Sequence, residues 1–421
     1  MQKYSKYKDS GVKWLGEIPS HWEVLAIKHV LKLKKNIVGK QSSQFDLLSL
    51  TLKGVVKRDM ENPEGKFPAS FDAYQIVEPN DFVFCNFDNE ETPRAVGLSP
   101  YKGMITGAYD VLFRKNPKLT DKFLIYYFLY IDDAKRFKPL YKGLRKTVPF
   151  DSFMSYKIPI PSLQEQDAIV SYLDSVTSKI DEAIAQQQKK IDLLNERKQI
   201  IINDSVTKGL DPKAKMKNSG IDWIGQIPEN WTTIRIKYLL NESKERSEYG
   251  REEPLSMSQL YGIIPTKNMG TIPNMAMSFV GAKVVKKGNL VFNKLKAHLG
   301  VFNVSKYDGL VSPDYAVYTS TGRADLSFLE YVFKTPKCIH EFVKLITGVG
   351  AGLSRLYTSD LYSIYCALPS LEEQKKICIF IEEKTKKIKE AIIMYQQEID
   401  LLQERKQIII NDVVTGKVKV A

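Results

Sequence analysis

The sequence predicts a mixed α/β protein with two α/β heads and two long antiparallel helices, related by an internal pseudo-twofold repeat. Three observations support this class. Near-identical segments recur at about half the chain length of 421 residues. Each copy ends in a long stretch with helical apolar spacing. The segment before each stretch contains short β-like runs broken by turn residues.

The repeat divides the chain into four parts. Residues 10–31 recur as residues 219–240, a shift of 209, and residues 191–207 recur as residues 399–415, a shift of 208 with 15 of 17 positions identical. The phrase Pro-Ser-Leu-x-Glu-Gln begins at Pro161 and again at Pro369. We therefore expect heads at residues 1–160 and 209–368, and helices at residues 161–208 and 369–421.

The heads diverge more than the helices do. Their β-like runs are at residues 81–84, 110–113, 290–292 and 315–318, and they are separated by Gly, Pro and Asn. A helix around residues 122–137 is expected to correspond to one around residues 326–345. Two bodies that act on different targets can diverge in this way, whereas helices that pair with each other cannot.

The tails have the pattern of long amphipathic helices. Residues 164–207 contain neither Gly nor Pro, and a helix of about 44 residues is ~66 Å long. Its apolar stripe must be buried against another element, for which the other tail is the obvious partner. The stripe comprises Ile169, Leu173, Val176, Ile180, Ile184, Ile191, Leu194 and Ile201, and in the second tail Ile377, Ile381, Ile388, Ile392, Tyr395, Ile399, Leu402 and Ile409.

Chain connectivity predicts the direction of the helices. The second head lies between the end of the first helix and the start of the second, and residues 209–217 form only a short connection. These two helix ends must therefore lie near each other, so the helices run antiparallel. We expect a rod with one head at each end.

The positive charge is concentrated in the heads. The chain has 62 basic and 49 acidic residues, a net charge of +13. Residues 164–208 carry 6 basic and 8 acidic residues (−2), and residues 371–415 carry 8 and 9 (−1), which leaves +16 for the rest. Basic heads favour a nucleic-acid partner, and near-neutral helices argue against a membrane-surface helix.

The sequence shows no signal peptide, no transmembrane segment and no metal-binding motif. The N-terminal segment lacks an apolar core, and the longest apolar run, residues 123–131, is about half of a bilayer span. We expect a cytoplasmic protein with no membrane partner. The four cysteines form no C-x-x-C pair and the four histidines have no ligand spacing, so no metal site and reduced thiols are predicted.

No catalytic motif is recognisable. There is no G-x-x-x-x-G-K-[ST] phosphate loop, no G-x-S-x-G element and no Asn/Asp-Pro-Pro-Tyr/Phe tetrapeptide of amino-group methyltransferases. A nuclease-like set of Asp59, Glu64 and Lys66 is too loosely spaced. We therefore expect no catalytic residues in this chain.

Candidate DNA-binding residues are basic or polar side chains in the heads. Two loops stand out, residues 142–146 and residues 348–355, where the backbone can approach phosphate while Arg or Lys reaches a base edge. A flexible connector is the alternative explanation for each loop. The candidates are Arg94, Lys102, Lys142, Arg145, Lys146, Lys294, Lys296, His298 and Arg355.

The repeated segments of this sequence resemble those of a known family. The repeated Ser-Gly-x-x-Trp-[Leu/Ile]-Gly-x-Ile-Pro segment, the Pro-Ser-Leu-x-Glu-Gln helix starts, the Glu-Arg-Lys-Gln-Ile-Ile-Ile-Asn-Asp helix ends and residues 309–315 are similar to specificity subunits of type I restriction–modification systems. In the first head, Gly107-Ala108-Tyr109 replaces Pro313-Asp314-Tyr315. We expect this difference to alter a turn and not the role.

The resemblance implies a set of partners. Each head would recognise one half of an interrupted, asymmetric double-stranded DNA sequence. The helices would set the spacer and dock two methyltransferase subunits that bring S-adenosylmethionine and methylate adenine. Motor-nuclease subunits would add ATP- and Mg²⁺-dependent cleavage, and this chain would bind no cofactor. The docking candidates are Glu196, Arg197, Lys198, Gln199, Asn203, Glu404, Arg405, Lys406, Gln407 and Asn411.

Two other classes remain open at this level. One is a coiled-coil scaffold whose heads bind proteins. The other is a self-sufficient DNA-modifying enzyme, which the missing motifs disfavour.

Overall fold

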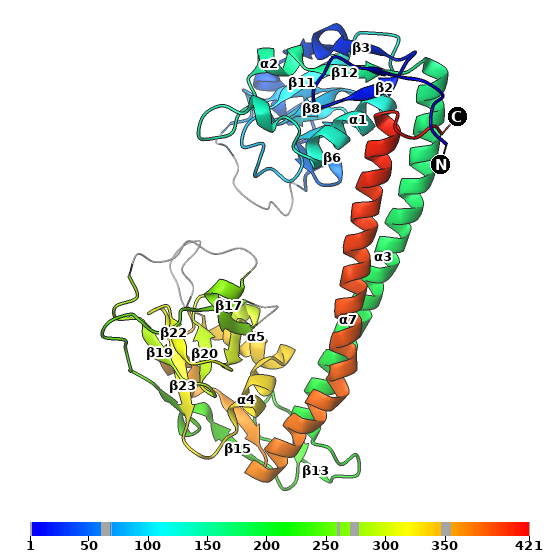
Figure 1. Ribbon diagram of the computed structural model, residues 1–421. Coiled ribbons are helices and arrows are strands. Elements are labelled where there is room, and N and C mark those ends of the chain that lie inside the picture. The colour runs from blue at the N-terminus through cyan, green and yellow to red at the C-terminus, as the bar shows by residue number, and fades with distance from the viewer. Residues whose placement is uncertain are drawn as a thin grey trace. The chain divides into compact units, whose positions relative to one another are not determined.

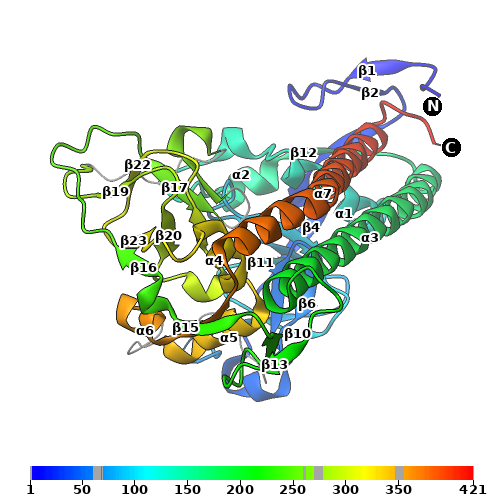
Figure 2. The same cartoon turned by 90° about the horizontal axis from the view of Figure 1, so that it is seen from below.

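A computed structural model describes residues 2–59, 68, 70–258, 262–269, 278–346 and 355–420. The chain forms two compact units, which are residues Met1–Gln188 with Gln397–Ala421 (unit 1) and Lys189–Gln396 (unit 2). Each unit contains one β-rich head and part of each long helix. The helices α3 (Leu163–Lys208) and α7 (Leu371–Val414) lie side by side in both views (Figures 1 and 2). The expected mixed α/β class is confirmed.

The head of unit 1 is built on a four-stranded antiparallel sheet in the order β4-β11-β8-β9. Two-stranded pairs β1-β2, β3-β12, β5-β6 and β7-β10 surround it. The strands are β1 Tyr7–Asp9, β2 Glu17–Pro19, β3 Glu23–Ala26, β4 Leu31–Lys34, β5 Leu48–Thr51, β6 Gly54–Lys57, β7 Gln75–Val77, β8 Phe82–Phe84, β9 Val96–Leu98, β10 Gly103–Ile105, β11 Asp110–Arg114 and β12 Lys157–Ile160. The helices of this head are α1 Asp121–Asp133 and α2 Phe150–Ser155.

The head of unit 2 repeats this topology. Its four-stranded sheet has the order β16-β23-β20-β21, and its pairs are β13-β14, β15-β24, β17-β18 and β19-β22. The strands are β13 Met216–Asn218, β14 Gln226–Pro228, β15 Thr232–Arg235, β16 Leu240–Glu242, β17 Leu255–Ser258, β18 Gly262–Pro265, β19 Lys283–Val285, β20 Leu290–Asn293, β21 Phe302–Val304, β22 Gly309–Val311, β23 Tyr315–Ser320 and β24 Tyr365–Leu368. The helices are α4 Leu326–Phe333, α5 Pro336–Leu345 and α6 Thr358–Ser363.

Both faces of each central sheet are apolar, as the alternation of strand side chains requires. In unit 1, Phe82 and Phe84 pack into the main core with α1, whereas Val83 between them packs into a smaller cluster with β5 and β7 residues. In unit 2, Val291 is separated from Leu290 and Phe292 in the same way. Burial on both faces explains why these runs are continuously hydrophobic.

The phrase Pro-Ser-Leu-x-Glu-Gln attaches each long helix to its head. In unit 1 the Ser162 hydroxyl accepts from the Glu165 amide, and the Glu165 carboxylate accepts from the Ser162 amide, which is a capping box. The other Glu165 oxygen accepts from Trp22 Nε1 at 3.2 Å. In unit 2, Trp231 Nε1 donates to Glu373 at 2.9 Å.

The next residue of the phrase, a glutamine, is fully buried in both units. Gln166 accepts from the amide of Thr120, the N-cap of α1, and donates to the carbonyls of Lys118 and Pro161. Gln374 accepts from the amide of Asp325, the N-cap of α4, and donates to the carbonyls of Arg323 and Pro369. One side chain thus fixes two helix starts.

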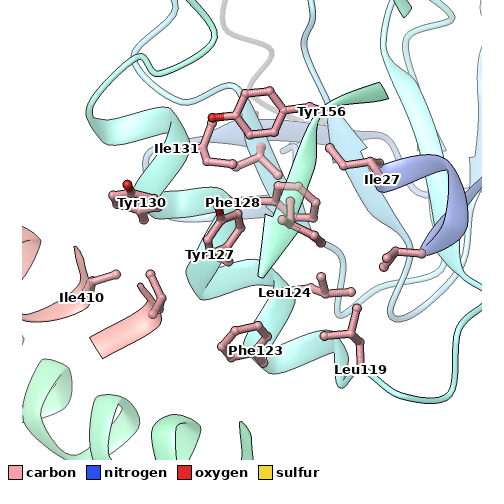
Figure 3. Close-up of a cluster of buried hydrophobic side chains, with 14 of the residues drawn as sticks. Ile27, Leu119, Phe123, Leu124, Tyr127, Phe128, Tyr130, Ile131, Tyr156 and Ile410 are labelled. Carbon is pink, nitrogen blue, oxygen red and sulfur yellow. The ribbon is translucent and has the colours of Figure 1, made fainter. Parts of the chain in front are cut away.

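The apolar stripe of the helices is buried or half-buried within each unit, and the helices are antiparallel. In unit 1, Ile169 and Leu173 near the start of α3 share a core with Val413 and Val414 at the end of α7. Ile410 of α7 faces Tyr127 and Tyr130 of α1 (Figure 3). In unit 2 the end of α3 shares its core with the start of α7, through residues such as Ile202, Val206, Ile377 and Ile381.

The helix expected around residues 326–345 is two helices, which corrects that prediction. Pro336 occupies the first turn of α5, and Thr335 caps it by accepting from the Cys338 amide. Because proline has no N–H and clashes with a preceding helical turn, a continuous helix cannot pass this point. The helix of unit 1 ends at Asp133, before Lys135 adopts a left-handed φ of 46°.

Replacing the buried glutamine tests its contribution to stability. In Gln166→Leu the Thr120 amide and two carbonyls lose their partner, so the free energy of unfolding is expected to fall by about 2–4 kcal/mol. Denaturant unfolding followed by circular dichroism measures this change. Gln164→Leu, an exposed position in the same turn, is the control, and an equal loss in both variants would contradict the prediction.

Candidate DNA interface

One end of the central sheet in unit 1 gathers polar side chains. The register pairs Asp110 at the start of β11 with Phe84 at the end of β8, so Asn86 and Asp110 are neighbours. Asn86 Nδ2 donates to Asp110 Oδ2 at 2.7 Å. Burial raises the pKa of Asp110, although this hydrogen bond and the charge of Lys35 oppose the shift.

The loop of residues 142–147 packs against this sheet end. Lys142 and Thr147 exchange two backbone hydrogen bonds, so the loop closes as a hairpin. The amide of Val148 donates to the carbonyl of Asn86, and the amide of Asp88 donates to the carbonyl of Arg145, both at 2.7 Å. The loop that sequence reasoning singled out is therefore an ordered part of the head.

Arg145 is the best-positioned candidate of this loop. Its Nε lies 3.1 and 3.2 Å from the two carboxylate oxygens of Asp88, and its Nη2 donates to Oδ2. The guanidinium carbon lies 4.8 Å from the centre of the Phe87 ring. The side chain is still 66% exposed. The hydrogen bond from Arg145 holds the pKa of Asp88 below its usual value.

The same end of the sheet in unit 2 carries a different polar group. Glu242, at the end of β16, lies 2.9 Å from Lys283 Nζ and 3.6 Å from Lys294 Nζ, and it accepts from the Thr358 hydroxyl at 2.6 Å. Lys283 is only 7% exposed. Burial alone would raise the pKa of Glu242, but the hydrogen bonds from Lys283 and Thr358 and the charge of Lys294 hold it below its usual value.

Three more candidates lie near Lys294. The amide of Leu356 donates to the Lys294 carbonyl, which brings Arg355 to this sheet end. Arg355 Nη2 lies 3.4 Å from Asp314. Lys296 is exposed, and His298 is half-buried in a short 3₁₀ turn, Ala297–Leu299. The rest of the predicted loop, residues 348–354, lies outside the described residues, as do Glu64 and Lys66.

The remaining two candidates are held in ion pairs within unit 1. Arg94 is 15% exposed and lies 2.8 Å from Asp133 and 3.4 Å from Asp132, at the end of α1, which favours a structural role. Lys102 is paired with Glu78 at 3.2 Å. The Glu78 carbonyl accepts from the residue before β8, so this pair lies at the opposite end of the sheet.

Sequence reasoning missed Asn86, Phe87 and Asp88. The repeat contained a signal for them, because Asn86 and Lys294 are related by the 208-residue shift. Two homologous positions with different polar side chains, each directly after a buried strand, indicate a variable sheet end.

The predicted docking residues on the long helices differ in their exposure and contacts. Glu196, Arg197, Glu404 and Arg405 are exposed. Gln199 and Lys406 instead make contacts within their own units, because Gln199 Nε2 donates to the Lys334 carbonyl at 3.1 Å and Lys406 Nζ lies 2.7 Å from Asp181. Burial, followed by the charges of Lys389 and Lys334, lowers the pKa of Lys198. Asn203, Gln407 and Asn411 lie on the same helical segments.

Sequence reasoning also missed an apolar component of this surface. Leu193 and Ile200 on α3, and Leu401 and Ile408 on α7, are each more than half exposed. The two pairs occupy equivalent repeat positions, and residues seven apart share one helix face. The repeat therefore exposes the same two apolar positions on each long helix.

The described residues contain no group of three or more His, Cys, Asp or Glu side chains that could hold a metal ion. The four cysteines are buried free thiols. No helix within the described ranges is both long and apolar enough to cross a membrane.

Comparisons with known proteins place the chain in a family. Residues 96–193 match the family model of the type I restriction modification DNA specificity domain. The putative type I restriction enzyme MjaX specificity subunit of Methanocaldococcus jannaschii is 26% identical over 447 residues, which cover 98% of each protein. The MjaVIII specificity subunit of the same organism is 26% identical over 436 residues, covering 98% of this chain and 97% of that protein.

A solved structure shares the fold. That structure comes from a study of complex assembly and conformational transition of the type I restriction–modification system. The alignment has a TM-score of 0.61 and 13% sequence identity, and it covers 95% of this chain and 99% of that chain. Fold and comparisons together define a non-catalytic protein that confers DNA sequence specificity. The chain is a specificity subunit of a type I restriction–modification system, a family that binds no cofactor of its own.

Glu242→Gln tests the ionic group of unit 2. The variant leaves the buried Lys283 ammonium without its carboxylate, so the free energy of unfolding near neutral pH is expected to fall by about 1–3 kcal/mol. Because the folded pKa of Glu242 lies below its unfolded value, the wild type loses this contribution as the pH falls through the folded pKa. The difference between wild type and variant should therefore shrink in acid.

Denaturant unfolding at several pH values measures this difference. Glu245→Gln removes a carboxylate from an exposed pair with Lys286, 3.1 Å apart, and should cost less than about 0.5 kcal/mol. A pH-independent difference for Glu242→Gln would refute the role assigned to its charge.

Proposed function

We propose that the heads, residues 1–160 and 209–368, read different halves of an interrupted, asymmetric double-stranded DNA sequence. One observation carries the proposal. The two heads share one topology, yet at the same sheet end unit 1 has Arg145 paired with Asp88 and unit 2 has Glu242 paired with Lys283 and Lys294. Different polar side chains on one scaffold are what two different half-sites require.

Phosphate contacts supply the sequence-independent part of the affinity. Lys142, Lys146 and Lys296 are exposed beside these sheet ends. Each phosphate that such a side chain neutralises makes binding more sensitive to salt. DNA binding by the assembled complex should therefore weaken steeply as the salt concentration rises.

The helices, residues 161–208 and 369–421, set the spacer between the half-sites and dock two methyltransferase subunits. The exposed Glu-Arg pairs and apolar pairs at matching positions on α3 and α7 support two similar docking surfaces. S-adenosylmethionine would bind to the methyltransferase subunits, and ATP and Mg²⁺ to the motor-nuclease subunits. We place this complex in the cytoplasm.

A head exchange tests the independence of the heads. Replacing residues 1–159 by the corresponding head of another family member should change one half-site and leave the other half-site and the spacer unchanged. Sequencing of methylated genomic DNA from cells with the assembled complex reports both half-sites. A change in both would refute independent heads.

A helix deletion tests the spacer role. Removing four residues from both α3 and α7 shortens each helix by about 6 Å, which corresponds to roughly two base pairs of B-DNA at 3.4 Å per step. The methylated site should keep both half-site sequences and lose about two base pairs of spacer. An unchanged spacer in an active complex would exclude the helices as its determinant.

A further inference from the structure

Arg145 has hydrogen-bonding capacity that the described residues of unit 1 do not use. A guanidinium has five N–H donors. Asp88 accepts from Nε and from Nη2, and this leaves the two Nη1 donors and one Nη2 donor. The ring of Phe87 covers one face of the group. The outer edge, formed by Nη1 and Nη2, therefore presents two parallel donors on an exposed side chain.

The segments that hold this pair are fixed by several contacts. Beyond the bond between the Asp88 amide and the Arg145 carbonyl, the Thr92 hydroxyl donates to the Asp88 carbonyl at 2.8 Å, and Tyr141 donates to Asn89 at 2.7 Å. Asp88 and Lys146 have left-handed φ values of 47° and 44°. Such conformations cost free energy in residues other than glycine, and they are concentrated at functional sites.

We propose that Arg145, held in orientation by Asp88, reads a guanine in the half-site of the unit 1 head. Guanine presents two acceptors, O6 and N7, to the major groove, which match the two parallel donors of the outer edge. Adenine would place its N6 donors against the guanidinium. The inference rests on the proposed function and deepens it by naming one base.

The counterpart in unit 2 is built differently. Arg355 Nη2 lies 3.4 Å from Asp314. Arg145, in contrast, donates to Asp88 through both Nε and Nη2. We therefore assign the guanine contact to Arg145 and not to Arg355.

The competing explanation is that the pair only ties two loops together. The two explanations differ in what a conservative change does. Arg145→Lys keeps the positive charge but removes the two-donor edge. If Arg145 recognises a base, the variant should lose the preference for guanine at one base pair. If the Arg145–Asp88 pair only holds the two loops together, the variant should lose affinity equally for every DNA sequence.

The test uses the full chain assembled with its methyltransferase subunits. Binding is measured to duplexes that carry the wild-type site and each single-base-pair substitution in it. For Arg145→Lys and Asp88→Asn, the preference for one guanine in the unit 1 half-site should fall by about 5-fold to 150-fold, the discrimination given by a bidentate contact. Preferences in the other half-site should persist, which also shows that the variants are folded and assembled.

Lys138→Gln is the matched control. Lys138 Nζ lies 2.8 Å from Glu90 and ties the same two segments, so its loss should leave every base preference unchanged. Unaltered preferences in Arg145→Lys, or a lost preference for a base other than guanine, would overturn the inference. Failure of the wild-type complex to select either half-site would instead refute the proposed function.

Discussion

The buried glutamine at the start of each long helix is the contact on which the rest of each unit depends. Gln166 and Gln374 each satisfy the N-cap amide of a head helix and two further carbonyls, at full burial. No apolar side chain can replace three such bonds without leaving buried polar groups unpaired. A single residue thus connects each long helix to the head of its unit.

This arrangement leaves the far end of each sheet free to vary. The strands are held on both faces by apolar clusters, so the side chains beyond their ends contribute little to the core. Unit 1 can therefore have an Arg–Asp pair where unit 2 has a Glu–Lys group. Side chains at that end can therefore vary without changing how the head is attached to its long helix.

Much of this organisation could be predicted from the sequence, because it depends on periodic or repeated patterns. The helical stripe, the doubled architecture and the strands after Asp81 and Asn289 all follow from spacing. Individual contacts do not. The contacts of the DNA-binding candidate Arg94 with Asp132 and Asp133 are an example. Its two carboxylate partners are nearly 40 residues away in sequence, at a separation that local patterns do not encode.

The sequence by itself determined the family, the two-unit plan and the starts of the two long helices, since repeated motifs, hydrophobic periodicity and capping motifs act over a few residues. It also marked the loop of residues 142–146. Only the tertiary structure decided that Arg145 is hydrogen-bonded to Asp88 and stacked on the Phe87 ring. It also decided that the apolar side chains of Leu193, Ile200, Leu401 and Ile408 are exposed. The physical reason is that orientation and exposure depend on which distant segments pack together.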